Sequence, residues 1–444
     1  MMCPSSHTGS NANRILTFRA AAIAADARTD SDHQERTAYR MDNASLVSRC
    51  ASYMKSLCET IPERAVGSEG NRRAAAFIEQ ELAAAGWEPE RQEFQAMDWI
   101  NGGASLTAEG RSFEVSVSPY SVGFEGTGKL LAISSMEELA AAELRGRILL
   151  LHNELAKEQL MPKNFVFYNP DKHQRIIALL EQGSPAALVC ATSRNAALAG
   201  GVYPFPLIED GDFDIPSVYM TEEEGQKLLA FEGADVSLKS FSTRVPGTGA
   251  NIMARKGSPT GKRIVITAHL DAKKGTPGAI DNATGVVVLL LLAQLLKDYD
   301  GDHCIEIVAL NGEDYYAVPG QMLYVARNQG KFEDMLLNIN IDGAGYLEGP
   351  SAYSTYQLPQ NLLQQVRDVF DGSDSIVEGP QWVQGDHSIF VQFGCPAVAL
   401  SSLWFTENID TQTITHTEKD TLGIVDNSRV VEIALALNKL SRTI

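Results

Sequence analysis

The chain has 444 residues, which exceeds the usual limit for a single hydrophobic core, so we expect two domains and a tail. Acidic residues outnumber basic ones by 56 to 37, and the formal net charge of -19 has the wrong sign for a surface that binds nucleic acid. The longest apolar run, from Val286 to Leu296, is too short to cross a bilayer as a helix, so we expect no membrane partner either.

Six cysteines are spread along the chain without a CxxC pair or regular spacing. In a chain of this size such a distribution indicates reduced thiols and a cytoplasmic protein. The stretch from Ile15 to Ala25 has some features of a signal peptide, which leaves secretion as the alternative, although Arg19 interrupts it. Met41 begins a more protein-like sequence, and we expect residues 1–42 to be a disordered or non-native extension.

The first elements predicted after this extension are two helices and two strands. Apolar residues recur at intervals of three and four from Asn43, and a second such run extends from Ala74 to Ala85. Two alternating stretches then predict strands at 92–96 and 113–117.

Between residues 124 and 245 the sequence changes to short strands and helices without clustered metal-type ligands, which predicts an inserted smaller α/β domain. Its pieces include L-R-G-R-I-L-L-L (144–151) and I-P-S-V-Y-M-T-E-E-E-G (215–225), and they resemble the protease-associated domain. The alternative is an ordinary small α/β lid. We therefore assign residues 43–123 and 246–444 to the main domain and residues 124–245 to the insert.

Strands and helices alternate along the rest of the chain. We predict strands at 264–268, 305–310, 335–341 and 397–401, and helices at 283–296, 320–327, 358–370 and 428–440. This order is typical of right-handed crossovers and of a mainly parallel mixed sheet sandwiched by helices.

Five short polar clusters occur in this region, most of them at the end of a predicted strand. They are H-L-D (269–271), D-N (281–282), G-E-D (312–314), N-I-D-G (340–343) and T-H-T (415–417). The carboxyl ends of parallel strands meet at one edge of a sheet, so we expect these clusters to converge there. Imidazoles and carboxylates are ligands that zinc and similar cations bind, and no nucleophilic Ser or Cys is needed to explain the pattern.

Each cluster has an ordinary explanation when it is taken alone. An acid before a helix is typically an N-cap, adjacent acids on a loop are usually solvated, and an Asp after a strand is often a turn residue. The joint occurrence of all five on loops at one sheet edge favours a metal site. His269 and Asp271 are two residues apart, so in extended backbone both project to one face and the carboxylate can hold the imidazole by its second nitrogen.

Together these residues resemble the family twenty-eight metallopeptidases, the co-catalytic zinc aminopeptidases and their carboxypeptidase relatives. The most specific match is G-A-I-D-N-A-T-G (278–285), and R-A-V-G-S-E-G-N (64–71) and G-D-H-S-I-F (385–390) also match. The resemblance extends over about residues 43–119 and 251–440. It implies the zinc-exopeptidase, or phosphorylase/hydrolase-like, fold.

The resemblance also implies roles for the five clusters. The implied metal ligands are His269 and Asp342 for a first ion, Asp314 and His416 for a second, and Asp281 as the bridge between them. Glu313 is the expected general base and Asp271 a further catalytic residue. The implied cofactors are two Zn²⁺ ions, with Mn²⁺ or Co²⁺ as substitutes.

Two positions depart from the family pattern. Asp314 stands where the family usually has Glu, although Asp is also seen, and the shorter carboxylate is expected to weaken the second metal or change which ion is preferred. Ala272, followed by Lys273 and Lys274, stands where the family often has Ser.

The function that this resemblance implies is a metal-dependent exopeptidase, foremost an aminopeptidase that hydrolyses N-terminal bonds of a peptide or small amide. The alternatives are a carboxypeptidase or other amidohydrolase of the same family, a one-metal acyltransferase of the glutaminyl-cyclase type, and a non-catalytic binding module. Plausible donors at all five ligand positions argue against the binding module, and the insert argues against the acyltransferase. The oligomeric state is open, with a homodimer as one option.

Overall fold

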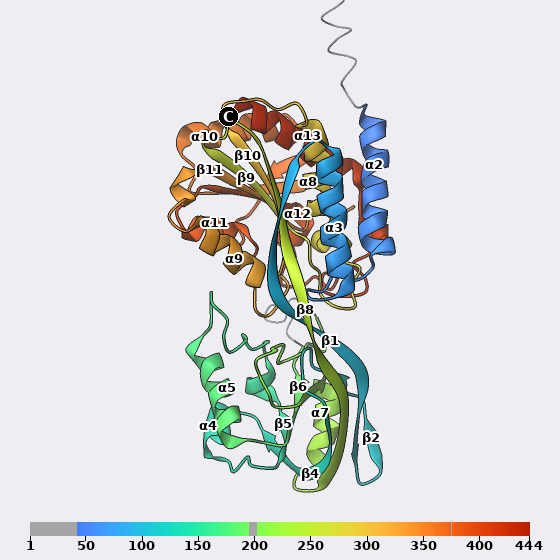
Figure 1. Ribbon diagram of the computed structural model, residues 1–444. Coiled ribbons are helices and arrows are strands. Elements are labelled where there is room, and N and C mark those ends of the chain that lie inside the picture. Colours follow the sequence, from blue (N-terminus) through green and yellow to red (C-terminus); the bar gives the residue numbers. More distant parts are fainter. Residues whose placement is uncertain (1–41, 195–201, 374) are drawn as a thin grey trace, which may run out of the picture. The chain divides into compact units, whose positions relative to one another are not determined.

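A computed structural model of the protein describes residues 42–194, 202–373 and 375–444 (Figure 1). The expected extension at residues 1–42 therefore lies outside the described residues, apart from its last position. Residues 49–444 form one compact unit, and residues 42–48, with the start of helix α2 (Asn43–Lys55), are the described part of the other. All the strands and all five polar clusters belong to the larger unit.

The larger unit is built on one 14-stranded mixed sheet. Its strands are β1 (Glu88–Ala108), β2 (Arg111–Phe113), β3 (Ser116–Val117), β4 (Phe124–Ile133), β5 (Ile148–Leu151), β6 (Ala187–Thr192), β7 (Ser217–Thr221), β8 (Asp235–Gly257), β9 (Arg263–His269), β10 (Cys304–Leu310), β11 (Met335–Ile341), β12 (Ser351–Tyr356), β13 (Ile376–Glu378) and β14 (Ala397–Ser402). The strand order is β13-β12-β14-β11-β9-β10-β8-β4-β5-β6-β7-β3, with β1 paired to both β2 and β8.

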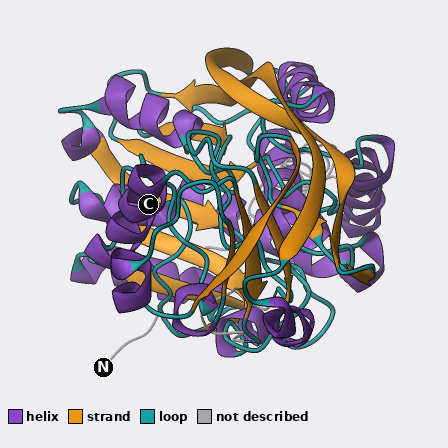
Figure 2. Cartoon of the chain, turned by 90° about the horizontal axis from the view of Figure 1, so that it is seen from below, coloured by secondary structure: helices purple, strands orange, loops and turns teal. Residues whose placement is uncertain are grey.

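The helices of this unit lie against the sheet in two groups. They are α3 (Glu69–Ala84), α4 (Met136–Ala141), α5 (Asp171–Gly183), α7 (Glu222–Leu228), α8 (Thr284–Leu295), α9 (Pro319–Asn328), α10 (Gln360–Phe370), α11 (His387–Gln392), α12 (Leu403–Glu407) and α13 (Asn427–Thr443). Helices flank the strands of the main sheet (Figure 2), and Figure 1 shows α8 and α13 on one side and α9 and α11 on the other.

The central strands of the main sheet are parallel, as the alternating sequence predicts. Strand β9 pairs in parallel with β10 and β11, and β11 pairs in parallel with β14. Strands β8 and β12 run antiparallel to this group, so the sheet is mixed. Because parallel strands all end at the same edge, the loops after β9, β10 and β11 are brought together.

The long apolar run is the buried helix α8 that the sequence predicts. Ten consecutive side chains of this helix, from Thr284 to Ala293, are buried, and the helix packs against α13 and α3. None of the described helices combines the length and the apolar character that a membrane crossing would need.

The region expected to be an insert contains its own parallel strands. Strands β4, β5, β6 and β7 pair in parallel, with α4, α5 and α7 beside them. Strand β8 continues without a break through Pro246–Gly249, although this stretch is rich in Pro and Gly. The reason is that β1 pairs with β8 along almost its whole length, so the Pro and Gly residues are held in a two-stranded ribbon despite their low strand propensity.

Candidate metal centre

The predicted ligands lie where the parallel strands end. His269 is the last residue of β9, Asp314 lies in the loop after β10, and Asp342 follows β11 directly. Asp281 lies in the turn that leads into α8, and His416 lies in the loop between α12 and α13. Residues from five separate places in the chain therefore meet at the carboxyl edge of the sheet.

The five side chains approach each other closely. The imidazole Nε2 of His269 lies 3.1 Å from Oδ1 of Asp281 and 3.6 Å from Oδ1 of Asp342. On the other side, Nε2 of His416 lies 3.0 Å from Oδ2 of Asp281 and 3.0 Å from Oδ1 of Asp314. Asp281 thus directs one oxygen to each imidazole, which is the arrangement of a carboxylate placed between two neighbouring cation sites.

The donor set fits divalent metal ions. Two imidazoles and three carboxylates are ligands that zinc accepts. Among the described residues, Nε2 of His269 and Oδ2 of Asp314 are buried and have no hydrogen-bond partner, and one ligand atom each from His269, Asp281 and Asp314 lie within 4.8 Å of one another. A bound cation would satisfy these buried atoms and would offset the repulsion among the carboxylates.

The charges of the site are strongly coupled. Burial opposes the charged form of His269, but Asp271, Asp281 and Asp342 raise its pKa well above the usual value. Burial likewise opposes the charge of His416, while Asp314 and Asp281 raise its pKa. Burial also opposes ionisation of Asp281, yet the two imidazoles hold the pKa of this carboxyl well below its usual range. Asp281 and the two imidazoles therefore stabilise each other's charged forms.

Asp271 lies beside His269, as expected, and also contacts the loop of Glu313. Its carboxylate Oδ1 is 3.7 Å from Nδ1 of His269, too far for a hydrogen bond, and Nδ1 instead contacts the backbone oxygen of Asp271 at 3.2 Å. The carboxylate accepts the backbone N–H groups of Gly312, at 2.7 Å, and Asp314, at 3.0 Å. Its side chain therefore fixes the loop on both sides of Glu313, in addition to its electrostatic effect on the imidazole.

Glu313 lies between these two anchored residues. In the described part of the chain, no hydrogen bond or ion pair joins the carboxylate of Glu313 to another residue. No such contact therefore holds this carboxylate away from the metal centre. Burial raises the pKa of Glu313 well above its usual value, helped by the carboxylates of Asp314 and Asp342, although the charge of His269 opposes the shift. A carboxyl group of raised pKa beside a metal site suits the transfer of a proton.

Asp281 is placed by residues that no sequence motif singled out. The carboxylate of Asp420 accepts the backbone N–H groups of Ile280, at 2.7 Å, and of Asp281, at 3.0 Å. The alternative explanation of Asp281 as a helix N-cap does not apply, because Oδ1 of Asn282 accepts the N–H of Gly285 at 3.0 Å and takes that role. Asp420 lies 139 residues further along the chain, and no sequence pattern connects the two positions.

Arg64, the first residue of the motif R-A-V-G-S-E-G-N (64–71), is a second residue that positions the turn of Asp281. Its buried guanidinium donates hydrogen bonds to four backbone oxygens, those of Leu57, Leu270, Pro277 and Gly278, at 2.7–3.0 Å. The side chain ties the loop after β9 to the turn that contains Asp281. The resemblance included Arg64, but only the fold shows what it contacts.

Two residues that could stabilise an oxyanion are engaged in other contacts. Nε2 of His387 lies 3.0 Å from the backbone oxygen of Trp382, and burial lowers the pKa of His387 to about 4, which keeps the ring neutral. The ring of Tyr346 packs against Trp404 and Phe405, with ring centroids 4.9 Å apart in each case.

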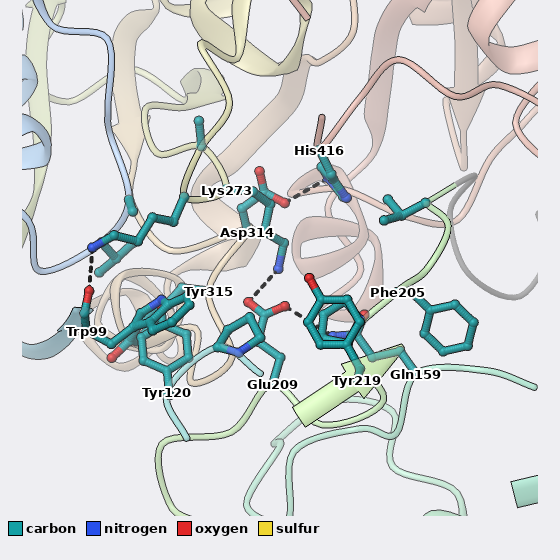
Figure 3. A pocket seen from close by; sticks show the side chains of 17 residues that line it. Trp99, Tyr120, Gln159, Phe205, Glu209, Tyr219, Lys273, Asp314, Tyr315 and His416 are labelled. Atoms are coloured by element: carbon teal, nitrogen blue, oxygen red, sulfur yellow. Dashed lines mark hydrogen bonds and ion pairs between the residues drawn. The ribbon is translucent and has the colours of Figure 1, made fainter. Parts of the chain in front are cut away.

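A cavity of about 150 Å³ adjoins the metal centre (Figure 3). Asp314 and His416 line one part of it, and its walls include the aromatic residues Trp99, Tyr120, Phe205, Tyr219 and Tyr315. Tyr315 lines this cavity, whereas Tyr316, Trp382 and Trp404 are not among the described residues that line it.

An ion pair crosses the same cavity between the main sheet and the region 124–245. Nζ of Lys273 lies 2.9 Å from Oε1 of Glu209, and Nε2 of Gln159 donates to the other oxygen of Glu209 at 3.1 Å (Figure 3). The neighbouring Lys274 pairs with Asp98 at 2.7 Å. The two lysines that follow Ala272 are therefore both paired beside the site.

This fold and this donor set define a class of α/β proteins with a metal centre at the carboxyl edge of the sheet, and sequence comparison gives the family. Residues 251–440 match the model of Peptidase family M28. This part of the chain is therefore similar to peptidase family M28.

Curated and solved relatives agree with this assignment. The chain is 23% identical to aminopeptidase YwaD of Bacillus subtilis over 302 residues, which is 66% of this chain and 61% of that protein. The fold resembles the aminopeptidase from Aneurinibacillus sp. strain AM-1, with a TM-score of 0.70 and 19% identity over 90% of this chain and 93% of the other. It also resembles BSAP, a zinc aminopeptidase from Bacillus subtilis, with a TM-score of 0.69 and 19% identity over 89% and 94%. At these identities the solved structures show a shared fold.

Proposed function

We propose that the chain is a zinc-dependent aminopeptidase that hydrolyses the N-terminal bond of a peptide or small amide. The observation that supports this most directly is the placement of Asp281 between His269 and His416, with Asp342 and Asp314 on the two sides. Two relatives are named aminopeptidases, which supports peptides with a free N-terminus as the substrate class. The five free cysteines of the described residues support a cytoplasmic location.

The distances between these side chains support two ligand sets. His269 and Asp342 would hold a first ion, Asp314 and His416 a second, and Asp281 would bridge the two. Bound zinc ions supply a polarised substrate carbonyl and a water of lowered pKa. Glu313 accepts a proton from the attacking water and passes it to the leaving amine.

The other residues of the site act by positioning. Asp271 holds the loop of Glu313 through two backbone N–H groups, and Asp420 holds the turn of Asp281 in the same way. The aromatic walls of the adjoining cavity exclude water and accommodate an apolar substrate side chain beside Asp314 and His416.

The proposal is tested with paired substrates. Aminoacyl p-nitroanilides with a free amine and their N-acetylated forms are assayed with zinc, manganese or cobalt, together with metal analysis of the purified protein. We expect hydrolysis of the free-amine substrates only, and about two equivalents of metal per chain. Release of C-terminal residues from N-blocked peptides would instead establish a carboxypeptidase.

The role of Glu313 is tested by Glu313→Gln, with Glu348→Gln on an exposed loop as the matched control. Loss of the general base should lower kcat by about 10²–10⁴ while metal content stays unchanged. An unchanged rate would remove Glu313 from the mechanism, and a loss of metal would show that Glu313 acts as a ligand.

A further inference from the structure

A second hollow lies at the opposite edge of the main sheet, at the amino ends of β9 and β10. It has a volume of about 640 Å³, and Arg263 and Cys304, the first residues of these two strands, are part of its wall. Strand β9 extends from this hollow to His269, and its seven residues separate the two places by about 20 Å. The hollow is therefore distinct from the metal centre and from the cavity beside it.

The wall of this hollow is basic in a chain that is strongly acidic. Five cationic residues line it, namely Arg255, Lys256, Arg263, Arg327 and Lys331, while Glu90 and Asp334 are the only acidic residues among the described ones that line it. If the buried Glu306 beneath the hollow is included, five cationic residues face three acidic ones, so the local charge is positive. The whole chain, by contrast, has a net charge of -19. We name this hollow the basic pocket.

The floor of the basic pocket is rigid. Glu306 is fully buried, and its Oε2 accepts from Nε of Arg255 at 2.7 Å and from Nη1 of Arg263 at 3.1 Å. The hydroxyl of Tyr324 donates to the other oxygen at 3.0 Å. The Arg263 guanidinium also donates to Asn328 and to the backbone oxygen of Lys331. One carboxylate therefore orients two guanidinium groups and neutralises only one of them.

Several donors of the basic pocket are left without an acceptor. Arg255 uses only Nε in its contact with Glu306, and neither of its terminal nitrogens donates to any residue that the structure describes. Arg327 uses only Nη1, toward Glu90 at 3.0 Å. The side chains of Arg255 and Arg327 remain 48% and 51% exposed, so a ligand can reach them.

We propose that the basic pocket binds a small multivalent anion of the phosphate class, such as a di- or triphosphate group. Paired guanidinium nitrogens match phosphate oxygens in geometry, and several oxygens can accept from several cations at once. A ligand with a single carboxylate would leave most of these cations unneutralised. The acidic remainder of the surface disfavours a long polyanion such as nucleic acid, so the ligand is a compact one. This binding does not depend on aminopeptidase chemistry at the metal centre.

Isothermal titration of the full-length protein with inorganic tripolyphosphate tests the proposal. We expect a dissociation constant below about 1 mM at low salt, and weaker binding at high salt because the contacts are exposed and screened. Arg255→Gln and Arg327→Gln should each weaken binding by about tenfold or more, since each removes a charged hydrogen-bond donor. Lys239→Gln, which removes an exposed lysine paired with Glu125 elsewhere on β8, is the matched control and should bind as the wild type does.

The controls separate this site from the metal centre, where phosphates can also bind metal. Binding that persists after treatment with EDTA, and that is lost in Arg327→Gln, supports the basic pocket. Unchanged affinity in both arginine variants, or no binding up to about 10 mM, overturns the proposal. Tighter binding of a tetraglutamate peptide than of tripolyphosphate overturns the assignment to phosphate. Arg327 is half exposed, so its variant is expected to fold, which thermal melting verifies.

Discussion

Replacing Asp271 by Asn separates the role that the structure gives this residue from the role that the sequence suggested. In the structure the two carboxylate oxygens accept the N–H groups of Gly312 and Asp314 on either side of Glu313. An asparagine keeps one acceptor oxygen and places an NH₂ group against the second N–H. The variant should therefore loosen the loop of the general base and leave His269 in place.

The size of the effect follows from these two contacts. A hydrogen bond to a charged group contributes about 1.5–3 kcal/mol, and one of the two is lost. If about 2 kcal/mol of this holds Glu313 in its working position, kcat/KM falls by about 30-fold. The loss should appear in kcat, with KM nearly unchanged, because substrate binding does not use this loop contact.

The assay measures kcat, KM and bound zinc for Asp271→Asn beside Asp235→Asn, an exposed carboxylate that pairs with Lys129. We expect full metal content in both variants and reduced kcat only in the first. Activity within about twofold of the wild type would refute the argument. A parallel fall in zinc content would show that Asp271 supports the imidazole after all, as its spacing from His269 suggested.

Three further predictions concern stability. Arg64→Met leaves four buried backbone oxygens without their donor, so it should lower the free energy of unfolding by several kcal/mol, measured by urea titration. His387 has a folded pKa of about 4, below the unfolded value of about 6.5, so its stabilising effect is complete above pH 6.5 and is lost as the pH falls toward 4. This loss amounts to about 3 kcal/mol, and His387→Asn should flatten the dependence of unfolding free energy on pH. Removal of metal with EDTA should lower the melting temperature, because the carboxylates of Asp281, Asp314 and Asp342 then repel each other, and added zinc should restore it.

The sequence alone determined the alternating strands and helices and the edge of the sheet at which the ligands meet. A parallel sheet collects the ends of its strands at one edge, so the positions of His269, Asp314 and Asp342 could be predicted from their place after apolar runs. The burial of α8 also follows from its own sequence, because its apolar run has no polar face. The ligand role of these residues remains a prediction until metal is measured.

The tertiary structure decided the contacts that depend on distant partners. Asp420 and Arg64 position the turn of Asp281 through hydrogen bonds to backbone groups more than 130 residues away, and backbone groups leave no signature in a sequence. The continuous strand at Pro246 forms because β1 pairs with it along the whole ribbon, against the local preference of its residues. The basic pocket likewise joins Arg255, Arg263 and Arg327 from three elements, and only the packing of β8, β9 and α9 brings their charges to one place.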